Sequence, residues 1–115
     1  MTINERIREA VLPVVPVCVP DLYDGTAREY CTFNYSELPA IHGDDRPQAI
    51  RYLVQLHYFL PVSRSPLKKK RDLCCALLQA DFTYPTVENA SDGDYQHYVI
   101  ECEALERLEW DDGEV

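Results

Sequence analysis

The fold is decided by residues 50–60, which read IRYLVQLHYFL. Successive side chains of a β-strand point to opposite faces of its sheet. The even positions of this stretch carry only apolar or aromatic side chains: Tyr52, Val54, Leu56, Tyr58 and Leu60. We therefore expect a long strand over about residues 49–60, with this face packed on the core of the domain.

The odd positions of the same stretch combine charged, amide and large apolar groups. They are Arg51, Leu53, Gln55, His57 and Phe59. Such a mixture is typical neither of a solvated face nor of a second core. These five residues are therefore candidates for contact with a partner.

Length and composition predict one globular domain. The chain has 115 residues, of which 46% are hydrophobic and 27% charged, and its formal net charge is −9. We expect residues 1–115 to form a single domain, with an ordered core over about 3–104 and an acidic tail over 105–115. The negative charge argues against a general nucleic-acid coat, because phosphate binding needs a cationic surface.

The chain shows no signal for export or membrane insertion. Its first ten residues, MTINERIREA, lack the apolar run of a signal peptide, and no segment approaches the roughly 20 apolar residues of a membrane span. We expect a soluble, intracellular protein. The five cysteines are an odd number without a C-x-x-C pair, and we expect reduced structural thiols.

Periodicity along the chain predicts two helices and several strands. Thr2 and Glu5 have capping-box spacing before a helix over about 3–12. A second helix follows Ser65, a candidate cap, and Pro66, with Leu67, Cys74, Leu77 and Leu78 as its apolar face. Other segments are expected as an extended edge (13–20), strands (29–35, 49–60, 82–88, 95–103), a loop (36–48) and a helical turn after 103.

The connections determine the expected architecture. Loops such as 61–65 and 89–94 are too short for parallel crossovers, so the sheet should be mainly antiparallel. Two amphipathic helices would cover its apolar face. The predicted fold class is α+β, a mainly antiparallel sheet with two helices packed on one face.

Few residues indicate catalysis. His57 and His97 could face each other on neighbouring strands, either as a metal or pH-sensing pair or as two half-exposed strand histidines. Asp44 and Asp45 could bind a divalent ion or act as acid and base, although adjacent residues rarely converge on one reacting atom. No nucleotide-binding or nucleophile-elbow motif occurs, so we expect no enzyme, no cofactor and no resident metal.

Two charged segments are candidates for subunit contacts. The basic residues Lys68, Lys69, Lys70 and Arg71 crowd the start of the second helix, as either a solvated patch or a docking site for an acidic surface. The C-terminal end from Glu101 onward is strongly acidic, with Arg107 as its one basic residue. This acidic end of one copy could approach the basic helix start of the next.

The order of elements and four stretches resemble a known family. The stretches are PVVPVCVPDLYDGTAREYCTFNY (13–35), DDRPQAIRYLVQLHYFLP (44–61), KKKRDLCCALLQADFTYP (68–85) and QHYVIECE (96–103). Over about residues 3–104 the chain resembles the small tail terminator, or tail completion, proteins of long-tailed bacteriophages and prophages, which are often called minor tail proteins.

The resemblance implies a structural virion protein. Members of that family form a ring, commonly six-membered, that caps the head-proximal end of the tail tube and halts its polymerisation. Expected partners are other copies of the chain, the tail tube protein and the head-tail connector or neck protein, with DNA passing through the ring without specific binding. The implied location is the virion tail, and the host cytoplasm during assembly.

Three other functions remain open. A head-tail joining or neck protein is closely related to a terminator. A small acidic protein-binding module, such as an inhibitor that mimics nucleic acid, would act as a monomer or dimer on one basic target. A small enzyme would use Asp44 and Asp45 or the two histidines.

Overall fold

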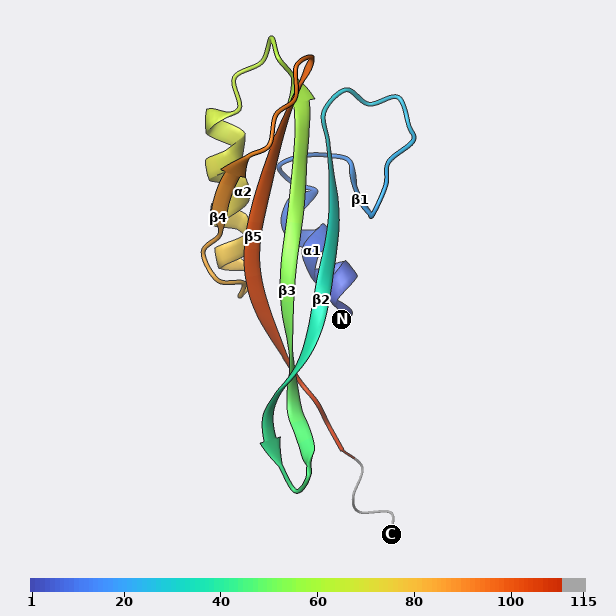
Figure 1. The fold of residues 1–115 in the computed structure, drawn as a ribbon, viewed down its shortest axis with the longest axis vertical. Helices are drawn as coiled ribbons and strands as arrows, with labels where there is room; N and C mark the ends of the chain where they lie inside the picture. Colours follow the sequence, from blue (N-terminus) through green and yellow to red (C-terminus); the bar gives the residue numbers. More distant parts are fainter. Residues whose placement is uncertain (111–115) are drawn as a thin grey trace.

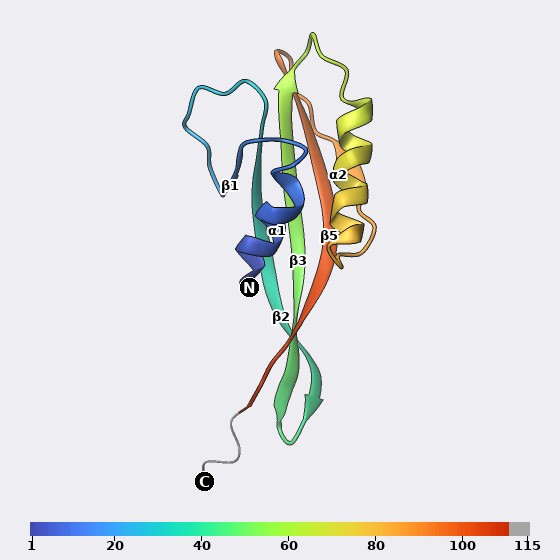
Figure 2. The same cartoon turned by 180° about the vertical axis from the view of Figure 1, so that it is seen from behind.

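The protein is described from a computed structural model that places residues 1–110. The elements in chain order are α1 (Ile3–Val11), β1 (Cys18–Pro20), β2 (Tyr30–Gly43), β3 (Arg46–Pro61), α2 (Leu67–Gln79), β4 (Thr86–Asn89) and β5 (Tyr95–Arg107). The strands form one sheet in the order β1-β2-β3-β5-β4, in which β1 runs parallel to β2 and the other neighbours are antiparallel. Both helices lie behind the sheet in Figure 1 and in front of it in Figure 2. The predicted α+β class is confirmed.

The even residues of β3 form the centre of the core, as their alternation predicts. Val54, Leu56, Tyr58 and Leu60 are almost completely buried, and Tyr52 is nearly so. Both neighbours of β3 add a core face: Cys31 and Phe33 come from β2, while Tyr98, Ile100 and Cys102 come from β5. Burying one face of three long strands is the main source of hydrophobic stabilisation.

The first helix begins and ends close to the predicted residues. The Thr2 side chain accepts a hydrogen bond from the backbone of Glu5, and the Glu5 carboxylate accepts one from the backbone of Thr2. These two bonds form the expected capping box. The buried side of α1 carries Ile3, Ile7, Ala10 and Val11.

The second helix packs through a different line of side chains from the predicted one. Its buried residues are Leu73, Cys74 and Leu77, whereas Leu67 and Leu78 are exposed. At about 100° per residue, Leu67 and Leu78 lie on a flank that turns away from the sheet. Ser65 is a marginal cap, since its hydroxyl lies 3.5 Å from the backbone nitrogen of Leu67 and the residue preceding the helix is Pro66.

The predicted loop over 36–48 is wrong, because this segment is a β-hairpin. β2 continues to Gly43, and β3 begins at Arg46 after the two-residue turn Asp44-Asp45. Pro39 is tolerated because this half of β2 has a strand partner on one side only, so that the absent N–H need not break a ladder. Asp44 and Asp45 form the turn itself, with φ of 53° and 63°.

The predicted helical turn after residue 103 is also wrong. β5 runs on to Arg107, with Leu105 and Arg107 paired to Arg51 and Ala49 of β3. The extended β3 offers hydrogen-bond partners to this segment. A single isolated helical turn is unfavourable, because its nucleation fixes several residues for one hydrogen bond. The predicted tail over 105–115 is therefore paired at its start, and residues 111–115 lie outside the described part of the chain.

Other predicted segments are confirmed in part. The segment 13–20 ends in the short edge strand β1, and β4 begins after Pro85 and is limited to Thr86–Asn89. The turn before β5 is at Gly93-Asp94, between the bridged residues Asp92 and Tyr95. All five cysteines are free thiols and only Cys75 is exposed.

The long strands make the molecule elongated, with extents of 60 × 25 × 23 Å. In Figure 1 the β2–β3 hairpin and the end of β5 project beyond the two helices. None of the helices within residues 1–110 is long and apolar enough to cross a membrane.

The hairpin turn predicts a stabilising substitution. Positive φ at a residue other than glycine costs roughly 1–2 kcal/mol, and a turn with positive φ at both positions favours Asn-Gly or Asp-Gly. We expect Asp45→Gly to raise the free energy of unfolding by about 1 kcal/mol in urea denaturation. Asp94→Gly is the matched control, because Asp94 is an aspartate of a two-residue turn without positive φ. A gain as large in Asp94→Gly would contradict this explanation.

Candidate partner interface

The candidate interface is the face of the sheet that neither helix covers, here called the open face. The odd residues of β3 lie on it: Arg51 and Leu53 are exposed, and Gln55, His57 and Phe59 are half-buried. The register adds the residues beside them, such as Asn34 and Glu101 on either side of Gln55. All five β3 candidates therefore share one surface, which faces the viewer in Figure 1.

Aromatic and histidine rings form a continuous row of contacts on the part of the open face near the loop between β1 and β2. Tyr23 packs on Tyr30 with ring centroids 4.7 Å apart, and Tyr30 packs on Phe59 at 4.8 Å. Phe59 then stacks on His97 at 4.2 Å, and His97 lies 5.0 Å from His57. Alternation assigns a ring to one face of its own strand, but only the cross-strand register shows that rings of different strands touch.

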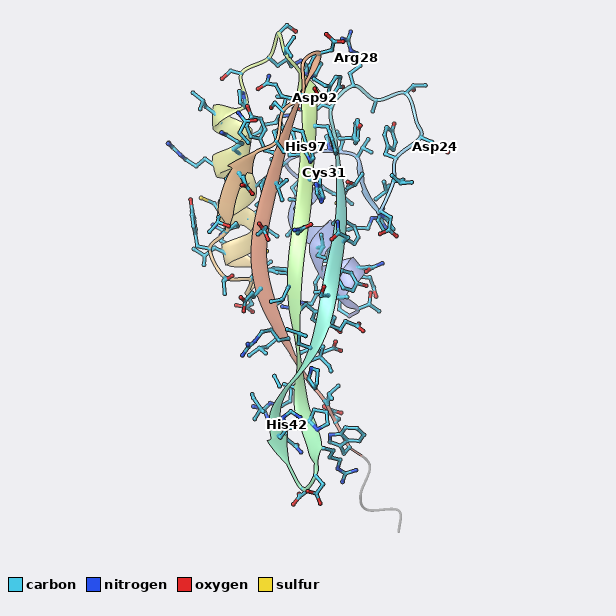
Figure 3. All side chains as sticks on the ribbon, in the orientation of Figure 1. Asp24, Arg28, Cys31, His42, Asp92 and His97 are labelled. Carbon is cyan, nitrogen blue, oxygen red and sulfur yellow. The ribbon has the colours of Figure 1, made fainter. Side chains whose placement is uncertain are left out.

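His57 and His97 form a hydrogen-bonded pair, as the sequence allowed. Nδ1 of His57 lies 2.8 Å from Nε2 of His97, and Nε2 of His57 lies 3.1 Å from the amide nitrogen of Asn34. Two neutral rings satisfy this chain if Asn34 donates to His57 and His57 donates to His97. Figure 3 labels His97, which comes from β5.

The pair is held neutral by its surroundings. Burial lowers the pKa of His57, the charge of His97 lowers it further, and Glu101 opposes both effects. Burial likewise lowers the pKa of His97. Within residues 1–110 no group of three His, Cys, Asp or Glu side chains converges, so the pair lacks a third protein ligand for a metal.

A polar depression of about 540 Å³ lies in the middle of the open face, between β2 and the segment 83–86. Gln55 donates a long hydrogen bond of 3.4 Å to Glu101 across its floor. The depression is lined by Asn34, Ser36, Leu53, Val54, Gln55, Thr83, Tyr84, Thr86, Glu101, Cys102 and Glu103. Hydroxyls, amides and two carboxylates on a shallow surface suit hydrogen bonding to a protein partner more than an apolar small molecule.

Three leucines surround Arg51 at the place where the strands extend beyond the two helices. Leu38 and Leu105 lie directly opposite Arg51 on the two neighbouring strands, and Leu53 lies two residues along β3. All three leucines are exposed. Arg51 faces Glu103 at 3.8 Å, and both side chains are about half-exposed, so this ion pair adds little to stability.

Leu38 and Leu105 are exposed residues of the open face that the sequence analysis missed. Leu38 fell in a predicted loop and Leu105 in a predicted helical turn. Extending the period-two pattern of the strands at 29–35 and 95–103 by a few residues would have placed both on the open face. The prolines and the acidic composition hid that signal.

The basic start of α2 lies on the other side of the sheet, so the two sets of candidate residues do not form one surface. Lys69 donates to Glu29 at 2.7 Å, and the hydroxyl of Tyr58 donates to the same carboxylate at 2.5 Å. Arg64 adds a weaker contact at 3.8 Å. Glu29 has only 12% of its side chain exposed, so Lys69 serves an internal ion pair.

The surroundings of Glu29 act in two directions on its pKa. Burial raises it, but hydrogen bonds from Lys69 and Tyr58 and the positive charges of Lys69 and Arg64 outweigh burial and lower it. The burial of Tyr58 and its bond to Glu29 raise the pKa of Tyr58. The carboxylate is therefore ionised and holds β3, α2 and the start of β2 together.

Other basic residues of α2 also form contacts within the domain. Lys70 lies over the ring of Tyr98, 4.3 Å from its centroid, and Lys68 pairs with Asp72 at 2.8 Å on the surface. Arg71 is exposed. Of the acidic end, Glu101 and Glu103 belong to β5, and Glu106 accepts a hydrogen bond from Tyr52.

No family model matches this chain, and no curated protein matches it. Function must therefore be argued from the residues of the chain and the surfaces on which they lie.

The internal role of Lys69 predicts a clear stability difference between neighbouring lysines. We expect Lys69→Met to lower the free energy of unfolding by about 1–3 kcal/mol, because Glu29 would stay largely buried without its cation. Lys68→Met, at an exposed pair in the same turn of helix, should change it by less than about 0.5 kcal/mol. Urea denaturation of the two variants measures both values, and equal effects would contradict the internal ion pair.

The histidine pair predicts a pH-dependent stability. Because folding lowers the pKa of both rings, the unfolded chain binds protons more readily than the folded chain below about pH 6.5. The free energy of unfolding should be constant above that pH and fall as the pH decreases through it. The double variant His57→Gln, His97→Gln should show a smaller decrease in the free energy of unfolding between about pH 7.5 and 5.5. Urea denaturation at about pH 7.5, 6.5 and 5.5 measures this decrease.

His42→Gln is the control for that measurement, because His42 is an exposed imidazole on the projecting hairpin (Figure 3). It should retain the full wild-type dependence on pH. A double variant with the wild-type slope would show that the paired rings do not cause it.

Proposed function

We propose that this protein is a structural subunit of a ring that caps the head-proximal end of the tail tube of a long-tailed bacteriophage or prophage. The observation that supports the proposal is the open face. Every second residue of the long central strand β3 lies on this face, among them Arg51, Leu53 and Phe59, and neither helix covers it. Antiparallel sheets often leave one face to solvent, but exposed leucines gathered on that face mark a site of protein contact. An assembly subunit needs one.

The choice of a phage tail rests on the resemblance of four sequence stretches to tail terminator proteins. The fold is compatible with that resemblance, since it contains a short first helix, an extended segment, a long central strand, a lysine-bearing helix and a final strand in this order. The proposed partners are further copies of the chain, the tail tube protein and the connector or neck protein. The proposed location is the virion tail, after assembly in the bacterial cytoplasm.

The charge of the chain supports a role beside DNA without specific binding to it. The net charge is −9, and the open face carries Glu101 and Glu103 in its central depression. A negatively charged ring repels the phosphate backbone, so DNA could pass without being retained.

The proposal predicts two results that can be measured separately. Light scattering behind size exclusion should show a species of about six times the 13.3 kDa monomer mass, alone or together with tube protein. The second measurement adds the protein to polymerising tube protein from the phage or prophage that encodes the chain. The protein should stop elongation of the tube and appear at one tube end in electron micrographs. The variant Leu53→Glu should lose the capping of tubes without unfolding, because Leu53 is exposed on the open face.

Other outcomes favour the other functions. Binding to the connector without any effect on tube length would indicate a head-tail joining protein. A monomer or dimer that ignores tubes and binds one basic protein tightly would indicate the acidic binding module and overturn the terminator proposal.

A further inference from the structure

Two outward surfaces lie at the opposite edges of the sheet, and both adjoin the open face, through Tyr23 at one edge and Tyr84 at the other. One is the loop between β1 and β2, beside the β1 edge. The other is the flank of α2 together with β4, beside the β4 edge, here called the α2–β4 flank. The strand order β1-β2-β3-β5-β4 places them on opposite sides of the molecule, as Figure 1 shows.

The loop holds one leucine outward by a fixed backbone. Asp21 has a φ of 61°, and its backbone N–H donates to Phe33 at 2.9 Å. The backbone N–H of Leu22 donates to Pro20 at 2.8 Å. Leu22 is 88% exposed, although such a large apolar side chain could have been turned inward.

Tyr23 fastens the rest of the loop. Its hydroxyl accepts a hydrogen bond of 2.8 Å from the backbone of Ala27, and its ring packs on Tyr30. The chain passes so close to this ring at Gly25 that a Cβ atom there would overlap with it. Leu22 is therefore presented by a preorganised loop, which reduces the entropy lost when it binds.

The α2–β4 flank offers a matching apolar surface. Leu67 is 70% exposed and Leu78 is 50% exposed. Helical geometry places both with Arg71 within about 40° of arc, at a separation of about 16 Å along the helix axis, so the two leucines lie at opposite ends of the flank. Tyr84 and Val87 are also exposed, just before and within β4. The Tyr84 side chain contacts Cys74, which lies one turn before Leu78 on α2.

The charges beside these two surfaces are opposite. Asp21 and Asp24 flank the exposed leucine of the loop, while Arg71 lies beside the leucines of the flank and Lys68 is paired with Asp72. Figure 3 labels Asp24 at the outer rim of the loop, away from the body of the domain. Within residues 1–110, neither Asp24 nor Arg71 has an ion-pair partner closer than 4 Å.

We propose that Leu22 of one copy docks on the α2–β4 flank of the next copy, beside Leu78 and Tyr84, with Asp24 near Arg71. The two surfaces are different and lie at opposite edges, so the contact is heterologous and repeats from copy to copy. A repeated contact of this kind closes into a ring or grows into a filament. The inference rests on the proposed function in one respect, that the repeated contact closes into a ring and does not grow into a filament. The contact leaves the open face available to the tube.

Cysteine cross-linking tests the contact directly. The variant combines Leu22→Cys and Leu78→Cys with Cys75→Ser, which removes the one exposed native thiol. Mild oxidation at the concentration where scattering detects assembly should give a ladder beyond the dimer on a non-reducing gel. The control replaces Leu78→Cys by Leu105→Cys, at a leucine of similar exposure, 51%, on the open face.

Three results of this experiment would overturn the contact. They are no cross-link, a cross-link equal to that of the Leu105→Cys control, and a product that stops at the dimer. A dimer would indicate an isologous contact instead of a repeating one.

Charge reversal provides a second test that does not depend on oxidation. Asp24→Arg and Arg71→Glu should each raise the concentration needed for half-assembly by about tenfold or more. An equimolar mixture of the two variants should recover assembly, because alternating copies restore opposite charges at every contact. Unchanged assembly of the single variants, or a mixture without recovery, would overturn the contact.

These tests separate the contact from the proposed function. Rings that cap tubes without a cross-linked ladder would leave the function standing and remove the contact. A cross-linked ladder whose rings ignore tail tubes would establish the contact and remove the terminator function.

Discussion

Two short helices can cover only one face of a five-stranded sheet, and the rest of the structure depends on this constraint. β3 occupies the centre, and its even residues bury one face completely. Its odd residues remain on the open face, where Leu53 and Arg51 are exposed. The domain thereby obtains a single core and at the same time retains a broad surface that neither helix covers.

The buried side carries one charged junction that ties the layers together. Glu29 accepts hydrogen bonds from Tyr58 of β3 and Lys69 of α2, just before β2 begins. Burial of a carboxylate is costly unless it is paired and fully hydrogen-bonded. Because this one is, the position of α2 on the sheet is fixed by directional contacts as well as by apolar packing. That position determines which residues of α2 remain on the outer flank.

Three outward surfaces result from this arrangement, and they differ in chemistry. The open face carries stacked rings, a polar depression and leucines around Arg51. The loop at the β1 edge presents Leu22 beside acidic residues, and the α2–β4 flank presents Leu67 and Leu78 beside basic ones. A subunit that must contact identical neighbours and a different partner needs at least two such surfaces.

The sequence by itself determined the α+β class, the first helix and the core face of β3, and it left open whether His57 meets His97. These features follow from local periods and caps, since alternation and helical spacing depend on the backbone geometry of one segment. It did not determine that β2 and β5 continue to Gly43 and Arg107, because Pro39, the paired aspartates and the acidic end resemble a loop and a tail. Only pairing with β3 makes those segments strands, and with them Leu38 and Leu105 reach the open face. The tertiary structure likewise decided that Lys69 serves Glu29 and that Leu67 and Leu78 face outward, because charge pairing and helix rotation depend on residues far apart in the chain.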